Sequence, residues 1–318
     1  MMLPSAVPGG GDRLPSLPAT EGSAMIAIDW GTTHLRAYRL GAAGEILARR
    51  AQPTGIMAVA EGAFAETLAA LLAGFEEDDG PVLMSGMVGS RQGWIEVPYR
   101  DCPARLADLA SGLGRVTFGQ DRAAFICPGL ACRDGDGIPD VMRGEEVQIF
   151  GAMAAGGADV ATVCLPGTHS KHARLRDGAI ESFTTHMTGE VFALLRSHSI
   201  LGRTMQEGPP DFAAFDEGLH RAGQAGGLLH HIFGVRTRLL MGELGAPSLA
   251  DYLSGILIGH EIARAPMAGP VLVVGAPELA ARYVRACEQF GLEASAIDAD
   301  TATTRGLHAL AGLMGEAA

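Results

Sequence analysis

The chain has 318 residues, of which 47% are apolar, enough to build the core of one large domain or of two ordinary ones. Its 24 basic and 36 acidic residues give a formal net charge of −12 at pH 7. Because an acidic protein repels both nucleic-acid phosphates and anionic lipid, neither nucleic acid nor a membrane surface is an expected partner.

Residues 1–24 are rich in Pro, Gly, Ser and Ala and lack the apolar core of a signal peptide, so they predict a disordered leader. No apolar run is long enough to span a bilayer, and we expect a cytoplasmic protein. Strand patterns follow at 25–29, 34–40, 45–50 and 81–85, and helix patterns at 61–75 and 144–155.

The second half of the chain opens as the first half does. A Gly-Thr turn follows the first strand of each half, Gly31-Thr32 in one and Gly167-Thr168 in the other. This repeat predicts two duplicated α/β lobes around a central cleft, 25–156 and 157–318. Expected strands are 159–165, 171–176, 179–185, 270–274 and 294–297, and expected helices are 189–200, 211–233, 248–265, 277–290 and 301–314.

The first turn carries the residue types that a magnesium–phosphate site needs. Asp29 ends a buried strand and offers a hard oxygen ligand that reaches Mg²⁺ through water. Gly31 permits close approach of a phosphate, while Thr32 and Thr33 offer amides and hydroxyls. Arg36 returns on the next strand, where it can face the same anion. Taken by itself, this turn would be explained by a plain hairpin whose Asp and Thr side chains satisfy the turn. The second Gly-Thr turn later in the chain favours the functional interpretation.

The pattern Asp-x-Gly-Thr-Thr-x-x-Arg resembles the first phosphate motif of sugar kinases in the actin/hexokinase/Hsp70 superfamily. The chain as a whole resembles the 2-dehydro-3-deoxygalactonokinases, and the similar stretches run from Met25 to about Gly202. They are IDWGTTHLRAY, SGMVGSRQGW, MRGEEVQIFGA, LPGTHSKHARL and THMTGEVFALLRSHSILG. This resemblance implies the two-lobed actin-like ATPase fold, which is ribonuclease H-like, with ATP and Mg²⁺ as cofactors and a sugar acid as substrate.

The second turn is expected to hold nucleotide phosphates from the other lobe, although it is not a Walker A loop. Relatives often carry an acid at its head, where this chain has Leu165 and Pro166, so metal binding rests mainly on Asp29. The resemblance also places adenine beside the strand–Gly–helix turn at Gly275. The residues expected to bind phosphate here are Gly167, Thr168, His169, Ser170 and Lys171.

A kinase that phosphorylates an alcohol uses a carboxylate to accept the alcohol proton. Related sugar kinases supply it from an acid that precedes Gln and an aromatic-Gly pair. Glu145 and Glu146 both fit that description, and we favour Glu145. Two acids at a helix start also suit the helix dipole, which must be the role of at least one of them.

The loop after strand 81–85 is a candidate for binding the acceptor. Arg91 can pair with a carboxylate and Trp94 can cover a sugar face. The alternative is a surface turn with an exposed Arg and a core Trp, and the resemblance favours the substrate-binding interpretation. The second lobe is expected to contribute from its 185–190 segment. The substrate-binding candidates are Ser85, Gly86, Met87, Arg91, Trp94, Thr188 and Glu190.

The resemblance implies phosphorylation of 2-dehydro-3-deoxygalactonate to its 6-phosphate, in the breakdown of galactonate. Three alternatives stay open at this point: a kinase for another sugar or sugar acid, a phosphohydrolase of the same superfamily, and an actin-like nucleotide switch. The acceptor loop counts against the hydrolase, and the short chain counts against actin-like assembly. The sequence leaves the oligomeric state undecided, and a homodimer is compatible with it.

Overall fold

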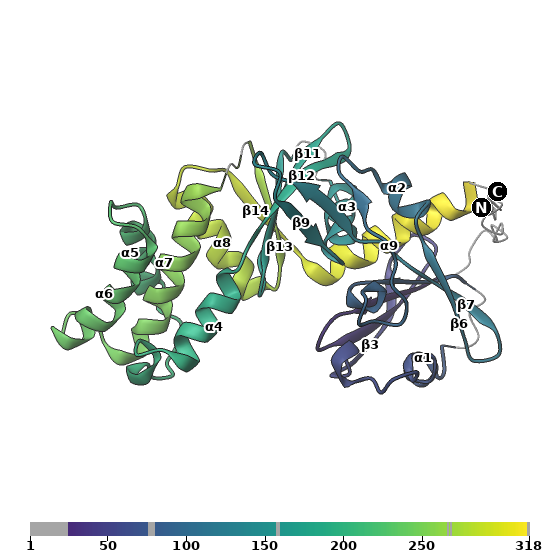
Figure 1. Ribbon diagram of the computed structural model, residues 1–318, viewed down its shortest axis with the longest axis horizontal. Helices are drawn as coiled ribbons and strands as arrows, with labels where there is room; N and C mark the ends of the chain where they lie inside the picture. Colours follow the sequence, from purple (N-terminus) through teal and green to yellow (C-terminus); the bar gives the residue numbers. More distant parts are fainter. Residues whose placement is uncertain (1–24, 76–79, 157–159, 266, 268, 317–318) are drawn as a thin grey trace, which may run out of the picture.

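The computed structural model describes residues 25–75, 80–156, 160–265, 267 and 269–316, so the predicted leader lies outside the described part. Two sheets stand apart in Figure 1, one built from the first half of the chain and one from the second. Within the described ranges, no helix combines the length and the apolarity needed to cross a membrane.

The first sheet has the strand order β3-β2-β1-β4-β7-β6. β1 pairs antiparallel with β2 and parallel with β4, which in turn pairs parallel with β7. Helix α1 (Phe64–Leu72) packs on one face. The strands are β1 (Met25–Trp30), β2 (Leu35–Leu40), β3 (Ile46–Gln52), β4 (Val82–Ser85), β6 (Gly114–Phe118) and β7 (Arg122–Ile126).

The second sheet has the order β12-β11-β10-β13-β14, which repeats the first five positions of the first sheet. The directions also match, because β10 pairs antiparallel with β11 and parallel with β13. This repetition confirms the predicted duplication. The strands are β10 (Thr162–Leu165), β11 (Ser170–Arg176), β12 (Ala179–His186), β13 (Val271–Gly275) and β14 (Ala294–Asp298).

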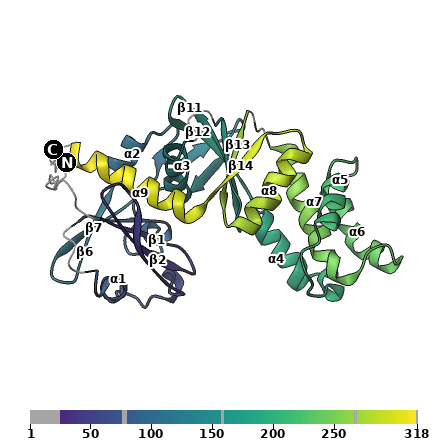
Figure 2. The same cartoon turned by 180° about the vertical axis from the view of Figure 1, so that it is seen from behind.

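Helices cover the second sheet and extend beyond it, with α4 to α7 forming the far end of the molecule in Figures 1 and 2. The single helix predicted at 211–233 is wrong: α5 ends at Ala222 and α6 begins at Leu228. Gly226 and Gly227 both have positive φ, which breaks the helix. The helices are α4 (Thr188–His198), α5 (Phe212–Ala222), α6 (Leu228–Leu240), α7 (Leu249–Arg264), α8 (Pro277–Gln289) and α9 (Ala299–Glu316).

The sequence pattern did not predict the elements that join β4 to the junction helix α3 (Glu145–Ala154). Besides the β6–β7 hairpin, these include a short helix and a sheet of order β5-β8-β9. Their strands are short and their residues lack a clear period, so propensity alone gives little signal. They are α2 (Leu106–Ala110), β5 (Arg100–Asp101), β8 (Leu130–Arg133) and β9 (Pro139–Met142).

Strand β1 is buried on both faces, and its alternation decides where Asp29 points. Ile26, Ile28 and Trp30 pack in the core that contains α1. Met25 and Ala27 pack instead in the core shared with α3, α9 and the second sheet. Because side chains alternate along a strand, Asp29 leaves the end of β1 on the face directed toward the second lobe.

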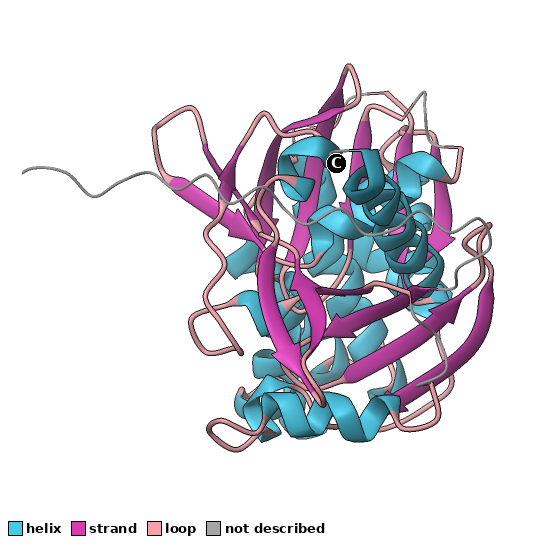
Figure 3. Ribbon diagram, turned by 90° about the vertical axis from the view of Figure 1, so that its right-hand side faces the viewer, coloured by secondary structure: helices cyan, strands magenta, loops and turns pink. Residues whose placement is uncertain are grey.

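Helices α3 and α9 cross closely between the two sheets. In Figures 1 and 2, α9 starts near the middle of the molecule and runs outward to the marked C-terminus, and the end-on view in Figure 3 shows the C-terminal helix with strands on both sides. A Cβ atom on Gly151 would lie 1.8 Å from the carbonyl oxygen of Ala302, and one on Gly306 would lie 2.0 Å from that of Val147. Helix α9 also contacts β1, β2 and β4, so it packs against both lobes. The lobe boundary predicted near 156–157 stays a prediction.

We expect Gly306→Ala to lower the free energy of unfolding by about 1–3 kcal/mol or more, because the added methyl group meets backbone atoms of α3 that cannot move cheaply. Gly312→Ala is the matched control on the same helix, since a Cβ there would contact nothing within 4 Å. The control should be neutral or slightly stabilising. Urea denaturation measures both, and equal stabilities would contradict the close crossing.

Candidate active site

The first turn connects β1 to β2 at the position that the sequence predicted. The Arg36 guanidinium lies 2.8 Å from Oδ2 of Asp29, in register across the hairpin. Burial raises the pKa of Asp29, and the charge of Arg36 opposes that rise. The Gly31 N–H donates to the carbonyl of His34 at 2.9 Å, which closes the turn. The Thr32 and Thr33 side chains are exposed, and the Thr33 hydroxyl lies 2.9 Å from Nδ1 of His34.

The sequence did not identify Asp300 as part of this site. Its carboxylate accepts a hydrogen bond from the Tyr38 hydroxyl at 2.7 Å and lies 2.7 Å from Nη2 of Arg49. Its charge also contributes to the raised pKa of Asp29. Asp300 lies in the first turn of α9, far along the chain from β1, and no motif around it signals that contact.

The two candidate acids at the start of α3 have different surroundings. Oε2 of Glu145 accepts a hydrogen bond from the Arg143 N–H at 3.0 Å, and its side chain is partly exposed. Glu146 is fully buried, and both of its carboxylate oxygens accept from the Gly144 N–H, at 2.9 and 2.8 Å. Burial and the neighbouring Glu145 raise the pKa of Glu146 to about 8.

Glu145 lies where the two lobes meet. Burial raises its pKa, the positive charge of Lys171 on β11 lowers it, and the negative charge of Asp29 on β1 raises it. Gly86 and Gly144 complete this contact, because a Cβ atom on Gly144 would lie 3.1 Å from the Cα of Gly86. The structure therefore brings together the first turn, the predicted acceptor loop and the predicted base.

The second turn packs against the start of α4. The imidazole Nε2 of His169 lies 2.6 Å from Oε2 of Glu190, and the Glu190 N–H donates to the carbonyl of Thr168 at 2.9 Å. Gly189 is pressed against Gly167, since a Cβ on Gly189 would lie 2.2 Å from the Gly167 carbonyl oxygen. Two sets of sequence candidates, the phosphate turn and the 188–190 segment, thus form one surface.

Two residues predicted to bind phosphate, Ser170 and Lys171, are buried and make their side-chain hydrogen bonds inside the protein. The Ser170 side chain is buried, and its hydroxyl lies 2.8 Å from that of Tyr283 on α8. Lys171 is only 6% exposed, and its ammonium donates to the Val141 carbonyl and the Thr185 hydroxyl. Because strand residues alternate in direction, the predicted run of five phosphate ligands cannot all face the same side.

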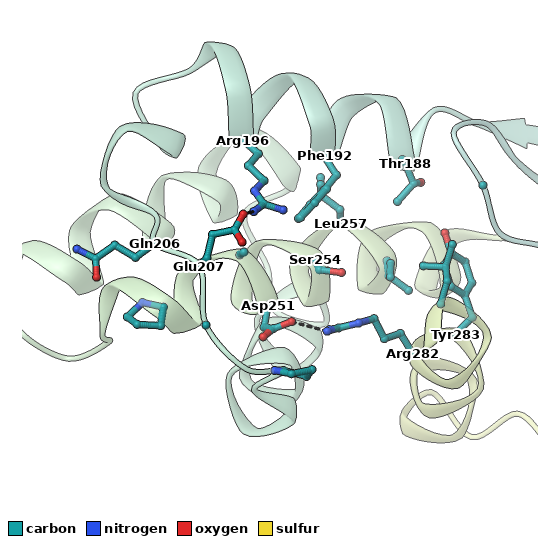
Figure 4. A pocket seen from close by; sticks show the side chains of 18 residues that line it. Thr188, Phe192, Arg196, Gln206, Glu207, Asp251, Ser254, Leu257, Arg282 and Tyr283 are labelled. Carbon is teal, nitrogen blue, oxygen red and sulfur yellow. Dashed lines mark hydrogen bonds and ion pairs between the residues drawn. The ribbon is translucent and has the colours of Figure 1, made fainter. Parts of the chain in front are cut away.

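A cavity of about 470 Å³ opens beside the second turn and is bounded by α4, α7 and α8 (Figure 4). Gly167, Thr188 and Gly189 line its end nearest the turn. Two ion pairs cross it, Arg282 to Asp251 at 2.5 Å and Arg196 to Glu207 at 3.1 Å. Gly275 lies nearby at the end of β13, where a Cβ would be 3.7 Å from Pro166.

The predicted acceptor loop divides into packed and exposed residues. Ser85 is buried, and its hydroxyl donates weakly to the Ile28 carbonyl at 3.4 Å. Met87 begins a short 3-10 helix, η2 (Met87–Gly89). Trp94 stacks on Phe64 of α1 with ring centroids 6.2 Å apart, so it is largely a packing residue. The Arg91 side chain is 86% exposed and lies 3.4 Å from Glu96, which leaves it able to meet a ligand.

Comparison with known proteins agrees with this arrangement. The family model described as 2-keto-3-deoxy-galactonokinase matches residues 29–310. A protein of Rhizobium meliloti (strain 1021) assigned as a 2-dehydro-3-deoxygalactonokinase is 41% identical over 297 residues, covering 90% of this chain and 95% of the relative. The 2-dehydro-3-deoxygalactonokinase of Escherichia coli (strain K12) is 35% identical over 290 residues, covering 90% of this chain and 97% of the relative.

Solved structures show the same fold. A crystal structure assigned to a 2-dehydro-3-deoxygalactonokinase protein from Sinorhizobium meliloti has a TM-score of 0.81 and 37% identity, covering 91% of this chain and 98% of that one. Component A of (R)-2-hydroxyglutaryl-CoA dehydratase from Acidaminococcus fermentans has a TM-score of 0.50 at 13% identity, covering 93% and 99% of the two chains, and speaks for the fold alone. The chain has the two-lobed actin-like ATPase fold and belongs to the 2-keto-3-deoxy-galactonokinase family of sugar-acid kinases.

Proposed function

We propose that the protein transfers the γ-phosphoryl group of ATP to the C6 hydroxyl of 2-dehydro-3-deoxygalactonate. The observation that supports this assignment beyond family membership is the place of Glu145 at the start of α3, next to Gly144, which approaches Gly86 of the predicted acceptor loop. The charges of Asp29 on one lobe and Lys171 on the other both act on its carboxylate. In the reaction the hydroxyl oxygen forms a bond to the γ-phosphorus, and the bond to the bridging oxygen breaks to release ADP. Glu145 accepts the hydroxyl proton.

The cavity beside the second turn suits the nucleoside of ATP, because its volume of about 470 Å³ is typical of small-ligand sites. The phosphates would then follow the exposed turn at Gly167, Thr168 and His169 toward Asp29. The Asp29 carboxylate is a hard oxygen donor and suits Mg²⁺ held through water. Bound Mg²⁺ would neutralise charge on the transferring phosphates.

The acceptor's place in this proposal is on the first lobe, along the loop from Ser85 to Trp94. Gly86 lies next to both Asp29 and Gly144, so a sugar acid on this loop has its hydroxyl near Glu145. The exposed Arg91 is the proposed partner of the substrate carboxylate, since its guanidinium can form two parallel hydrogen bonds with it. Thr188 and Glu190, expected from the sequence to meet the acceptor, are proposed instead to serve the nucleotide side, because Thr188 lines the cavity and Glu190 pairs with His169 of the second turn.

Arg91→Ala should raise the KM for the sugar acid about ten- to a hundred-fold, because a charged hydrogen bond to the substrate is lost. The KM for ATP should stay nearly constant. Arg115→Ala, which removes an exposed arginine from β6, is the control. Steady-state kinetics with each substrate varied in turn measures both constants, and an equal rise for ATP would place Arg91 on the nucleotide.

The overall assignment is tested by ADP formation with a panel of 3-deoxy-2-keto sugar acids, neutral sugars and no acceptor. The proposal requires the highest kcat/KM with 2-dehydro-3-deoxygalactonate and a 6-phosphate as product, identified by NMR. A preference for another acceptor would reassign the substrate and keep the kinase chemistry. Phosphate release that needs no acceptor would show a phosphohydrolase and overturn the proposal.

A further inference from the structure

Lys171 is the only lysine in the chain, whose other 23 basic residues are all arginines. It is also buried, with 6% of its surface exposed. Lysine presents a compact ammonium, whereas arginine presents a wide planar fork, so the two do not substitute for one another in a tight site. A single buried lysine in a chain that otherwise uses arginine indicates a position that needs a small point charge.

The contacts of Lys171 connect β11 to the strand that leads into the active site. Its ammonium donates to the Val141 carbonyl at 2.7 Å and to the Thr185 hydroxyl at 2.6 Å. That hydroxyl in turn donates to Asp140 at 2.6 Å, and the Thr185 N–H donates to the same carboxylate at 2.7 Å. Both Asp140 and Val141 belong to β9, so Lys171 fastens β9 to the second sheet.

Strand β9 continues directly into the segment that carries Glu145. β9 ends at Met142, and the next residue, Arg143, donates its N–H to the Glu145 carboxylate at 3.0 Å. Among the charged groups that act on this carboxylate, Lys171 lowers its pKa and Asp29 raises it. The adjacent Glu146, with a pKa of about 8, is mostly neutral at pH 7.

We propose that Lys171 is a positioning residue for Glu145: it anchors β9, the strand that leads into Glu145, and supplies a buried positive charge near the start of α3, and it does not hold a nucleotide phosphate. This reassigns the phosphate-binding role expected from the sequence. It rests on the proposed role of Glu145 as proton acceptor, so its test includes a measurement that needs no turnover.

Lys171→Met keeps the length of the side chain and removes the charge. Glu145 must be ionised to accept a proton, so turnover falls as the pH drops through its pKa. Without the positive charge of Lys171, the pKa of Glu145 rises. The acid limb of the plot of kcat against pH should therefore move up by about one pH unit or more. The KM for ATP should stay within about twofold of the wild type. Lys171→Arg, which retains the charge, should move the limb less. A tenfold rise in the KM for ATP with an unmoved limb would overturn the proposal.

Selective ¹³C labelling of lysine gives a direct test in the full-length protein, because a single side chain produces the signal. We expect the Lys171 signal to shift in Glu145→Gln and to move far less when Mg²⁺ and a non-hydrolysable ATP analogue are added to the wild type. The reverse pattern would make Lys171 a phosphate ligand and overturn the proposal. The signal is readable even if 2-dehydro-3-deoxygalactonate proves not to be the substrate, so the two proposals fail separately.

Discussion

Glu145→Gln should lower kcat by about 10²–10⁴-fold and leave the KM for ATP nearly unchanged. The amide has almost the size of the carboxyl group and can still accept the hydrogen bond from the Arg143 N–H. It cannot take up the proton that the acceptor hydroxyl loses as phosphoryl transfer proceeds. The loss therefore falls on the chemical step, and single-turnover kinetics with saturating ATP and acceptor measures it.

Glu146→Gln is the matched control on the next residue. With a pKa of about 8 the Glu146 carboxyl already carries its proton at pH 7, and it is buried, so it is poorly placed to accept another. A glutamine there can still accept from the Gly144 N–H. We expect turnover to stay within a few-fold of the wild type. If Glu146→Gln abolishes turnover and Glu145→Gln does not, the base is Glu146 and the assignment is off by one residue.

Asp29→Asn should reduce turnover by about 10²-fold or more at millimolar Mg²⁺, because a neutral amide binds hydrated Mg²⁺ poorly. The change also leaves the Arg36 guanidinium without the carboxylate that lies 2.8 Å away, which adds uncompensated positive charge beside the phosphates. Part of the activity should return as the Mg²⁺ concentration rises, since occupancy and not geometry is the larger defect.

The control for this change is Asp136→Asn, which removes one exposed carboxylate in the β8–β9 connection. It changes the net charge of the protein by the same amount as Asp29→Asn does. Titrating kcat/KM against Mg²⁺ separates the two variants, and thermal unfolding checks that Asp29→Asn remains folded. Wild-type turnover by Asp29→Asn at limiting Mg²⁺ would remove Asp29 from the metal site.

Local patterns in the sequence were sufficient for the strands that carry the phosphate turns. β1 and β10 are short, mainly apolar runs, and a Gly-Thr turn separates each of them from the strand that follows, β2 or β11. These signals depend on neighbouring residues only. The repeat of strand and turn also predicted the duplication, which the common strand order of the two sheets confirms. The helix predicted across 211–233 failed because Gly226 and Gly227 adopt positive φ between two helices of similar polarity.

Only the tertiary structure shows in which direction each candidate side chain points and how deeply it is buried. The sequence made Glu145 and Glu146 almost equally good candidates for the proton acceptor. Only the packing of α3 distinguishes them, because it leaves Glu145 partly exposed and buries Glu146 completely. Contacts with β9 and α8 bury Lys171 and Ser170, two of the five neighbouring residues that the sequence had treated as equivalent phosphate ligands. The docking of α9 also brought Asp300 from the other end of the chain to Tyr38 on β2 and Arg49 on β3.

The sequence by itself determined the strand–turn elements, the duplication and the chemical types at the site, because each is set by residues within a few positions of one another. The different burial of Glu145 and Glu146 and the close approach of the two lobes were decided by contacts between segments more than a hundred residues apart, such as α3 with α9 and β1 with α9. The burial of a side chain and the charges around it at such contacts exist only when both lobes are folded together. They therefore cannot be predicted from patterns of neighbouring residues in the sequence.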